Sequence, residues 1–183
     1  MIDINNLIHK IYIMRDLKRY NNAFRIKDES VAEHSYFVAM SVLLLNQIYN
    51  FDLNKAIQMA LVHDCGEPFI TDVPHDVKER FVELRNVLED SEKIAIKEEY
   101  PREIFDLFCE FEIGNTLEAL VVELADVISC IQFSSSEVNL GNGYMKRVLV
   151  ESVIRKEELE LKLLKHKKIK EGQTKIEEFG DEE

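Results

Sequence analysis

Apolar side chains recur three or four positions apart over most of this sequence, which is the spacing of one face of an α-helix. The first such stretch runs from Ile4 to Leu17 and predicts an amphipathic helix. Polar, basic and aromatic residues replace the pattern over residues 18–28, which is typical of a loop. No stretch shows the sustained alternation of apolar and polar residues that a half-buried strand needs. The chain is therefore predicted to be all-α.

Residues that start and stop helices divide the rest of the chain. Ser30 and Glu33 have the spacing of a capping box, which predicts a helix from there to about Tyr49. Two prolines within residues 67–74 predict an ordered loop or a short turn. Further helices are predicted from Asp52 to His63, from Val77 to Glu99, from Pro101 to Ile113, from a capping signature at residues 115–118 to a break at residues 140–143, and from Tyr144 to Leu164. The total is about seven helices.

The length of 183 residues suits one domain with a hydrophobic core and is short for two. Residues 1–165 are predicted to form that single compact domain. Residues 166–183 lose the helical spacing and change from basic to acidic character. They are predicted to form a charged, disordered tail.

The formal net charge of −12 argues against a general binder of nucleic acid or anionic membranes, because both need a basic surface. A small phosphate ester remains possible as a ligand, since a metal ion and one or two arginines supply local positive charge. The three cysteines are widely spaced and lack a CxxC pair, which favours a reducing cytoplasm over disulfides or a thiolate zinc site. Neither a signal peptide nor a membrane-spanning run is expected. These features predict a cytoplasmic protein.

The segment Leu61–Glu67 carries the most informative pair of residues, His63 and Asp64. Neighbouring helix residues point to different faces, so both side chains reach one metal ion only at a helix end or a bend. Gly66 is predicted to end the helix here in the left-handed conformation that glycine adopts readily. The segment therefore predicts a His–Asp pair at a helix end.

Two other predicted helices carry polar residues that match this pair. His34 lies in the first turns after Ser30, and Asp126 lies within a strongly apolar helix. Taken singly, His34 fits a partly buried histidine with a satisfied hydrogen bond, and Asp126 fits an exposed helix residue, because an unpaired buried charge is too costly. Taken together, His34, His63, Asp64 and Asp126 are candidate ligands of one divalent metal ion. Two imidazoles and two carboxylates suit Mn, Fe, Co, Ni or Zn without choosing among them.

These residues resemble the H…HD…D pattern of the HD-domain metal-dependent phosphohydrolases, and the resemblance is closer to the 5'-deoxynucleotidase branch. In that branch the first histidine follows a segment similar to Glu29-Ser30-Val31-Ala32-Glu33. The His–Asp pair is followed there by a Glu, a Thr/Gly-Asp, a Pro and a Lys, here Glu67, Thr71-Asp72, Pro74 and Lys78. Ala125-Asp126-Val127 is similar to the Ala-Asp segment of the branch. The similarity covers roughly residues 10–145.

The resemblance implies a single compact HD-domain helical bundle in which the four candidate ligands bind one divalent metal ion. It also implies that Glu67 assists the attacking water and that Asp72 contacts the sugar or the leaving oxygen. Arg19 matches an arginine that contacts phosphate, with Tyr20 and Lys78 as further substrate-binding candidates. The branch commonly has Trp where this chain has Tyr20, and that Trp helps to exclude the ribose 2'-hydroxyl. Selectivity for deoxyribose therefore stays open.

Residue chemistry alone leaves alternatives for two of these roles. Glu67 lies three residues after Asp64, so it can accept a proton from a water at the metal, or it can cap the proline-containing turn. Arg19 has the forked donors of a phosphate clamp, or it lies solvated in its loop.

The expected function is hydrolysis of (deoxy)nucleoside 5'-monophosphates to nucleoside and phosphate, with a small-molecule nucleotide as the binding partner. One alternative is a compact HD-type dNTP triphosphohydrolase, because residues 15–27 contain five basic side chains. A second is a non-catalytic HD-fold nucleotide sensor. Relatives in this branch associate as dimers, which implies a homodimer. The phenylalanine-rich segment from Glu103 to Phe111 is either its interface or part of the core.

Overall fold

The computed structural model describes residues 3–21, 23–70 and 80–178, and describes side chains as far as His166. This part of the chain contains no β-strand, only an isolated antiparallel bridge between Lys18 and Ser30. The helices of ten residues or more are α1 (Ile4–Ile13), α2 (Val31–Leu45), α3 (Leu53–Val62), α6 (Val82–Glu99), α7 (Arg102–Ile113), α8 (Leu117–Asn139) and α9 (Lys146–Glu178). The shorter α4 (Glu67–Ile70) and the 3-10 helix η1 (Gly143–Met145) complete the described elements. The all-α prediction is confirmed.

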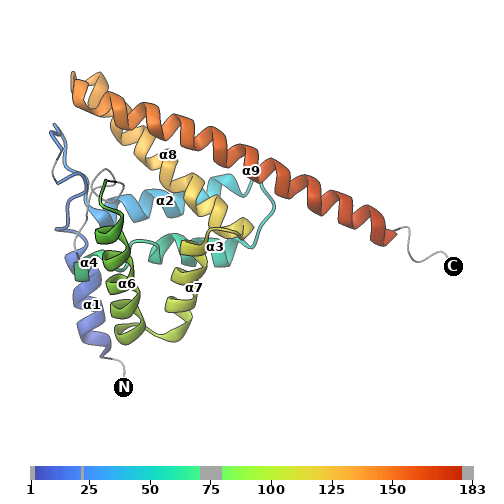
Figure 1. Ribbon diagram of the computed structural model, residues 1–183, viewed down its shortest axis with the longest axis horizontal. Coiled ribbons are helices and arrows are strands. Elements are labelled where there is room, and N and C mark those ends of the chain that lie inside the picture. Colours follow the sequence, from blue (N-terminus) through green and yellow to red (C-terminus); the bar gives the residue numbers. More distant parts are fainter. Residues whose placement is uncertain (1–2, 22, 71–79, 179–183) are drawn as a thin grey trace.

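Helix α8 forms the centre of the fold. Its residues 119–122 are consecutive and buried, so neighbouring helices cover it on all sides. α2 and α3 pack on it, contributing Val38, Val42 and Met59 to a common core, and α9 covers it with Leu159 and Leu163. Figure 1 shows α9 lying along α8 across one side of the molecule, with α1, α6 and α7 on the other side. The middle of α8 therefore adjoins both α2 and α3.

A second cluster of buried residues joins α1, α6 and α7 to the turn after α3. It consists of Leu7, Cys65, Ile96, Tyr100 and Phe108. Phe108 is 1% exposed, and Phe105 and Phe111 pack against the two clusters. Between the two alternatives for the segment from Glu103 to Phe111, the structure selects the core.

The predicted capping box at Ser30 is confirmed. The backbone N–H of Ser30 donates to Glu33 Oε2 at 2.8 Å, and the N–H of Glu33 donates back to Ser30 Oγ at 3.2 Å. Each contact satisfies a donor that the start of a helix leaves unpaired. The box fixes the start of α2, three residues before His34.

Helix α1 ends at Ile13, before the predicted end at Leu17. The carbonyls of Met14 and Leu17 accept hydrogen bonds from the N–H groups of Ala32 and Val31, at 3.1 and 3.0 Å. These contacts belong to the start of α2, so the chain turns at residues 14–17 instead of continuing the helix.

The predicted role of Gly66 as a left-handed helix stop is wrong. Among the described residues, positive φ angles occur at Tyr20, Gly114 and Gly141. At Gly66 a Cβ atom would lie 2.1 Å from Glu92 Oε1 and 2.3 Å from Glu92 Cγ. A side chain at position 66 would therefore displace the Glu92 side chain that approaches from α6, a contact that local sequence does not reveal.

The last helix also differs from its prediction. α9 continues to Glu178, past the expected end at Leu164 and into the segment predicted to be a disordered tail. Residues 165–178 contain several Lys and Glu residues, which are good helix formers. Figure 1 shows this part of α9 extending beyond the rest of the bundle.

Candidate metal centre

The four predicted metal ligands lie close together, although they come from separate elements. His34 is in the first turn of α2, His63 caps the C-terminal end of α3, Asp64 follows in the turn before α4, and Asp126 lies in α8. His34 Nε2 is 3.2 Å from His63 Nε2, 3.1 Å from Asp126 Oδ1 and 3.6 Å from Asp64 Oδ2. His63 Nε2 is 3.3 Å from the same oxygen of Asp64. We call these four residues the donor cluster.

The spacing of the donor cluster fits one divalent ion. Nitrogen and oxygen ligands lie about 2.0–2.2 Å from such an ion, which places neighbouring ligand atoms roughly 3 to 3.5 Å apart. The separations among His34, His63 and Asp64 run from 3.2 to 3.6 Å, and Asp126 adds an oxygen 3.1 Å from His34 Nε2. Both imidazoles are 1% exposed, whereas the side chains of Asp64 and Asp126 are 21% and 29% exposed. The carboxylate side of the cluster is therefore accessible to water and to a ligand.

Hydrogen bonds at the Nδ1 atoms orient both imidazoles toward this point. His63 Nδ1 lies 2.8 Å from the carbonyl oxygen of Ala60, which only accepts, so Nδ1 carries the proton and Nε2 has a free lone pair. His34 Nδ1 lies 2.9 Å from Ser129 Oγ, and a hydroxyl serves either tautomer. With the proton on Nδ1, His34 presents Nε2 as a ligand, and with the proton on Nε2 it donates to Asp126 Oδ1 at 3.1 Å. Such outer partners are the usual support of metal-binding histidines.

The protonation states favoured at His34 and Asp126 are those that bind metal. Burial lowers the pKa of His34, and the nearby positive charge of Arg19 lowers it further, so the neutral imidazole is favoured. Burial acts to raise the pKa of Asp126, but the hydrogen bond with His34 and the charge of Arg19 hold it well below its usual range. Metal ligands must be neutral imidazoles and ionised carboxylates. The residues present therefore fit a divalent ion.

Arg19 lies beside the donor cluster, at the start of the loop between α1 and α2. Its backbone N–H donates to the carbonyl of Glu29 at 3.0 Å, which closes the base of that loop just before α2. Its guanidinium lies 3.9 Å from Asp126 Oδ1 and 3.9 Å from Glu29 Oε2, and donates to Cys130 Sγ at 3.5 Å. Charge-assisted hydrogen bonds are about 2.7–2.9 Å long. Among the described residues, Arg19 has no carboxylate at that distance, so it retains donors for an anion.

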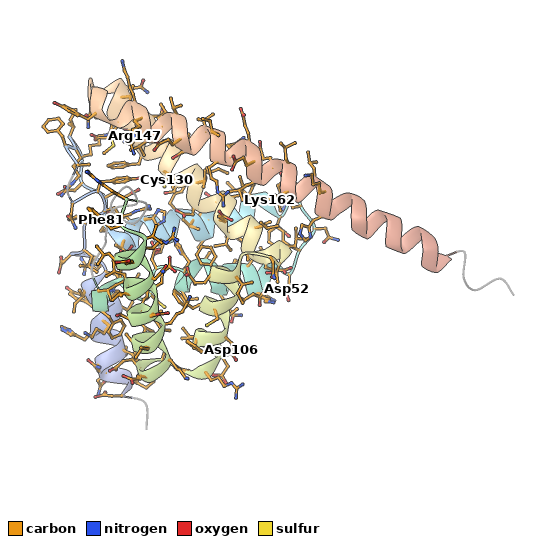
Figure 2. The ribbon with its side chains drawn as sticks, viewed as in Figure 1. Asp52, Phe81, Asp106, Cys130, Arg147 and Lys162 are labelled. Atoms are coloured by element: carbon orange, nitrogen blue, oxygen red, sulfur yellow. The ribbon has the colours of Figure 1, made fainter. Side chains whose placement is uncertain are left out.

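Tyr20 packs against α8 next to Arg19. Its backbone is left-handed, with φ at 57°, and its ring stacks on Phe133 with centroids 4.9 Å apart and planes 3° apart. Burial and the neighbouring Cys130 raise the pKa of the Tyr20 hydroxyl far above its ordinary value. The structure thus places both Arg19 and Tyr20 along the α8 face that carries Asp126. Cys130, labelled in Figure 2, marks this part of the helix.

Glu67 is the first residue of α4, and its N–H donates to the carbonyl of Asp64 at 3.2 Å. Its Oε2 atom is buried. Asp72 and Lys78, the other predicted substrate-contacting residues, lie outside the described residues.

Sequence reasoning missed three residues around the donor cluster: Ser129, Cys130 and Glu29. Ser129 and Cys130 follow Asp126 by three and four positions, so helical periodicity places them on the same face of α8. That spacing was the available signal. Glu29 was noted only as part of a motif, yet burial raises the pKa of its carboxyl and it faces Arg19.

This chain resembles a known protein family, curated relatives and solved structures. A family model described as 5'-deoxynucleotidase YfbR-like matches residues 6–169. The chain belongs to this YfbR-like family. The match includes the donor cluster, Arg19 and Glu67, and runs from α1 into α9. The resemblance to 5'-deoxynucleotidases is therefore confirmed.

Individual relatives of this YfbR-like chain agree with the assignment. It is 38% identical over 120 residues to a protein named 5'-deoxynucleotidase HDDC2 from Dictyostelium discoideum, which covers 56% of this chain and 60% of the relative. The chain thus spans less than two thirds of that protein. The solved structure of the PH0347 protein from Pyrococcus horikoshii OT3 superposes with a TM-score of 0.77 at 28% identity, covering 88% of this chain and 94% of that one.

An HD-domain phosphohydrolase from Listeria innocua has a TM-score of 0.69 at 23% identity, over 82% of this chain and 78% of that one. This likeness shows the fold alone, and it identifies the bundle as an HD-type fold. Among the described helices of this YfbR-like chain, none combines the length and the apolar character needed to cross a bilayer.

Proposed function

We propose that this protein hydrolyses (deoxy)nucleoside 5'-monophosphates to nucleoside and orthophosphate. The carrying observation is the combination of the donor cluster with the Arg19 guanidinium, whose nearest cluster oxygen is 3.9 Å away. The family of the chain and the name of its Dictyostelium relative support the same reaction. Each hydrolysis breaks the ester P–O bond, and water supplies the hydroxyl of the phosphate and the proton of the nucleoside.

The residues divide the work as follows. His34, His63, Asp64 and Asp126 hold a divalent ion, which supplies Lewis-acid chemistry to the phosphoryl group and to water. Arg19 binds the phosphate through its forked donors. Glu67, three residues after Asp64 at the start of α4, accepts the proton of the attacking water. Asp72, Lys78 and Tyr20 contact the substrate, as the resemblance to the 5'-deoxynucleotidase branch implies.

The placement of the other basic loop residues favours a monophosphate over a triphosphate. Arg25 donates to Asp28 at 2.8 Å and to the carbonyl of Tyr20 at 3.0 Å. Lys27 reaches Ser136 at 3.4 Å, and Arg15 lies over the ring of Tyr12. Three of the four basic side chains that accompany Arg19 in residues 15–27 thus contact local structure, and Lys18 is the remaining one. A triphosphohydrolase would need several cations at the donor cluster.

The proposal also covers the identity of the metal ion, the oligomeric state and the cellular location. The ion is one of Mn, Co, Fe, Ni or Zn, since the mixed nitrogen and oxygen ligands suit all five. The protein forms a homodimer, supported by exposed apolar side chains at Tyr36, Met40 and Leu44 on α2 and at Ile48 in the turn after it. Its three free cysteines support a cytoplasmic location.

Product analysis tests the proposal. Metal-stripped protein is re-supplied separately with Mn, Co, Ni, Zn or Mg and incubated with AMP, dAMP, TMP and dATP. Orthophosphate from the monophosphates is the expected result, and the ratio of AMP to dAMP turnover measures the selectivity that Tyr20 permits. Triphosphate from dATP with untouched monophosphates would replace the proposal by a triphosphohydrolase. Nucleotide binding without any product would leave a sensor.

A further inference from the structure

The loop between α1 and α2 lies along one face of α8, and successive turns of the helix contact successive parts of the loop. Asp126 and Cys130 face Arg19, and Phe133 stacks on Tyr20. One turn further along, Glu137 contacts the loop at residues 26–27. The loop is therefore attached to α8 from the donor cluster to the end of the helix.

Glu137 makes the strongest of these attachments. It is 0% exposed. Its Oε2 accepts the N–H of Ile26 at 2.7 Å and its Oε1 accepts the N–H of Lys27 at 2.8 Å. Asn142 Nδ2 donates to the same Oε2 at 2.7 Å and to the carbonyl of Phe24 at 2.8 Å. Three short hydrogen bonds to one buried carboxylate, and a fourth through Asn142, hold the far side of the loop.

The near side of the loop is held differently. The bridge between Lys18 and Ser30 and the bond from Arg19 N–H to Glu29 close its base. Tyr20 lies between this base and residues 24–27. Its backbone is left-handed, and Arg25 donates to its carbonyl at 3.0 Å. A left-handed backbone at a non-glycine residue is strained and persists only when its surroundings hold it. The contacts of residues 24–27 with Glu137 and Asn142 are part of those surroundings.

We propose that Glu137 is a positioning residue, which sets the place of Arg19 and Tyr20 at the reaction centre by fixing the loop that carries them. It touches neither the donor cluster nor the substrate. The loop is fixed at both sides before substrate binds. The Arg19 guanidinium is therefore held beside Asp126, with its nearest carboxylate oxygens among the described residues 3.9 Å away. The expected effect of Glu137 on kcat/KM rests on the proposed function. Its role in fixing the loop does not.

The direct test replaces Glu137 by Gln, which keeps the size of the side chain. The amide retains one acceptor oxygen, so either the N–H of Ile26 or that of Lys27 faces an NH₂ group and loses its partner. We expect kcat/KM for a nucleoside monophosphate to fall about tenfold, as expected for the loss of a buried hydrogen bond to a charged group. The dissociation constant of the metal stays within twofold of wild type. Glu157→Gln, at an exposed site on α9, is the matched control and leaves both values unchanged.

A double-mutant cycle separates positioning from general destabilisation. If Glu137 acts through Arg19, Glu137→Gln lowers kcat/KM in the wild-type background but causes little further loss in an Arg19→Ala background. Asn142→Ala provides a second route to the same loop should Glu137→Gln fail to fold. Equal losses in both backgrounds, or a metal dissociation constant that rises as much as kcat/KM falls, would overturn the proposal.

Limited trypsin digestion gives a readout that does not depend on turnover. Cleavage after Arg25 and Lys27 is expected to be at least several-fold faster in Glu137→Gln than in wild type and in Glu157→Gln. Unchanged cleavage, together with unchanged kcat/KM, would show that Glu137 does not hold the loop. If wild type hydrolyses no nucleotide but the variant still releases the loop, the proposed function fails while the role of Glu137 in fixing the loop stands.

Discussion

The Nε2 atoms of His34 and His63 lie 3.2 Å apart, although the two residues are 29 positions apart in the sequence. His63 keeps a free lone pair there because its Nδ1 proton is directed at the carbonyl of Ala60. Nε2 of His34 and Oδ2 of Asp64 lie 3.2 and 3.3 Å from His63 Nε2, a set of donors that a divalent ion would bring together.

Replacing His63 by Ala is expected to weaken metal binding by more than the roughly 10–100-fold that loss of an outer partner costs, because a ligand itself is removed. Metal content after dialysis and a competition titration with a chromophoric chelator measure the change. His9→Ala, at an exposed position on α1, is the control and binds metal as wild type does. Equal metal affinity in His63→Ala and wild type would place the ion elsewhere.

Ser129→Ala removes the hydrogen-bonding partner of His34 Nδ1 without touching a ligand atom. We expect the metal affinity to drop by roughly 10–100-fold, since the imidazole loses the hydrogen bond that orients it. Ser135→Ala, on the same helix, is the comparison and should change nothing. If both serine variants bind metal equally well, the Ser129 contact contributes packing only.

Glu67→Gln separates metal binding from proton transfer. The variant should bind metal normally, while kcat for a nucleoside monophosphate falls by about 10²–10⁴-fold, the usual contribution of a general base. Steady-state kinetics and metal titration on the same preparation measure both quantities. The exposed Glu83 of α6 offers Glu83→Gln as a control. Full activity in Glu67→Gln would leave the residue as a cap of the turn before α4.

Glu137 predicts a particular dependence of stability on pH. Burial acts to raise the pKa of its carboxyl, but hydrogen bonds from Asn142 and from the N–H groups of Ile26 and Lys27, with the charge of Lys27, lower it from the ordinary value of 4.5. A group whose pKa is lower in the folded state contributes stability above its unfolded pKa. That contribution is lost as pH falls through the folded value.

The difference in melting temperature between wild type and Glu137→Gln should therefore be largest near pH 7. It should shrink as the pH falls below about 4.5, the ordinary pKa of the group. Thermal unfolding of the metal-free proteins over a pH series measures it, with Glu157→Gln as a reference. A difference that grows toward acid pH would contradict the sign of the shift.

Gly66→Ala is expected to destabilise the fold by about 1–3 kcal/mol, the usual cost of inserting a methyl group into a filled space. The new Cβ would collide with the side chain of Glu92, and Gly66→Ala combined with Glu92→Ala should recover part of the loss. Gly143→Ala meets no atom within 4 Å and serves as the control. Urea unfolding compares the variants, and the absence of any recovery in the double variant would show that Glu92 is not the obstacle.

Much of the fold followed from patterns that are local in the chain. Apolar spacing, the capping box at Ser30 and the breaks near residues 114 and 140 were enough to define the helices and their order, because each depends on residues a few positions apart. The candidate ligands were equally visible, since His63 and Asp64 are adjacent and resemblance supplied their partners. Resemblance also pointed to Arg19.

The extension of α9 to Glu178 is local to its own residues. The early end of α1 and the role of Gly66 depend on contacts between separate segments. The packing of residues 103–111, which the sequence left open between core and interface, was decided in the same way.

The most informative contacts of the site are of the same kind. Ser129 reaches His34 across 95 positions, and Glu137 reaches Ile26 across 111. Local hydrophobic spacing specifies that a helix has a buried face, but it does not specify the register in which two such faces pack. That register arises only when the whole core closes, and it alone determines which polar side chains on α8 support the metal ligands and which hold the loop of Arg19.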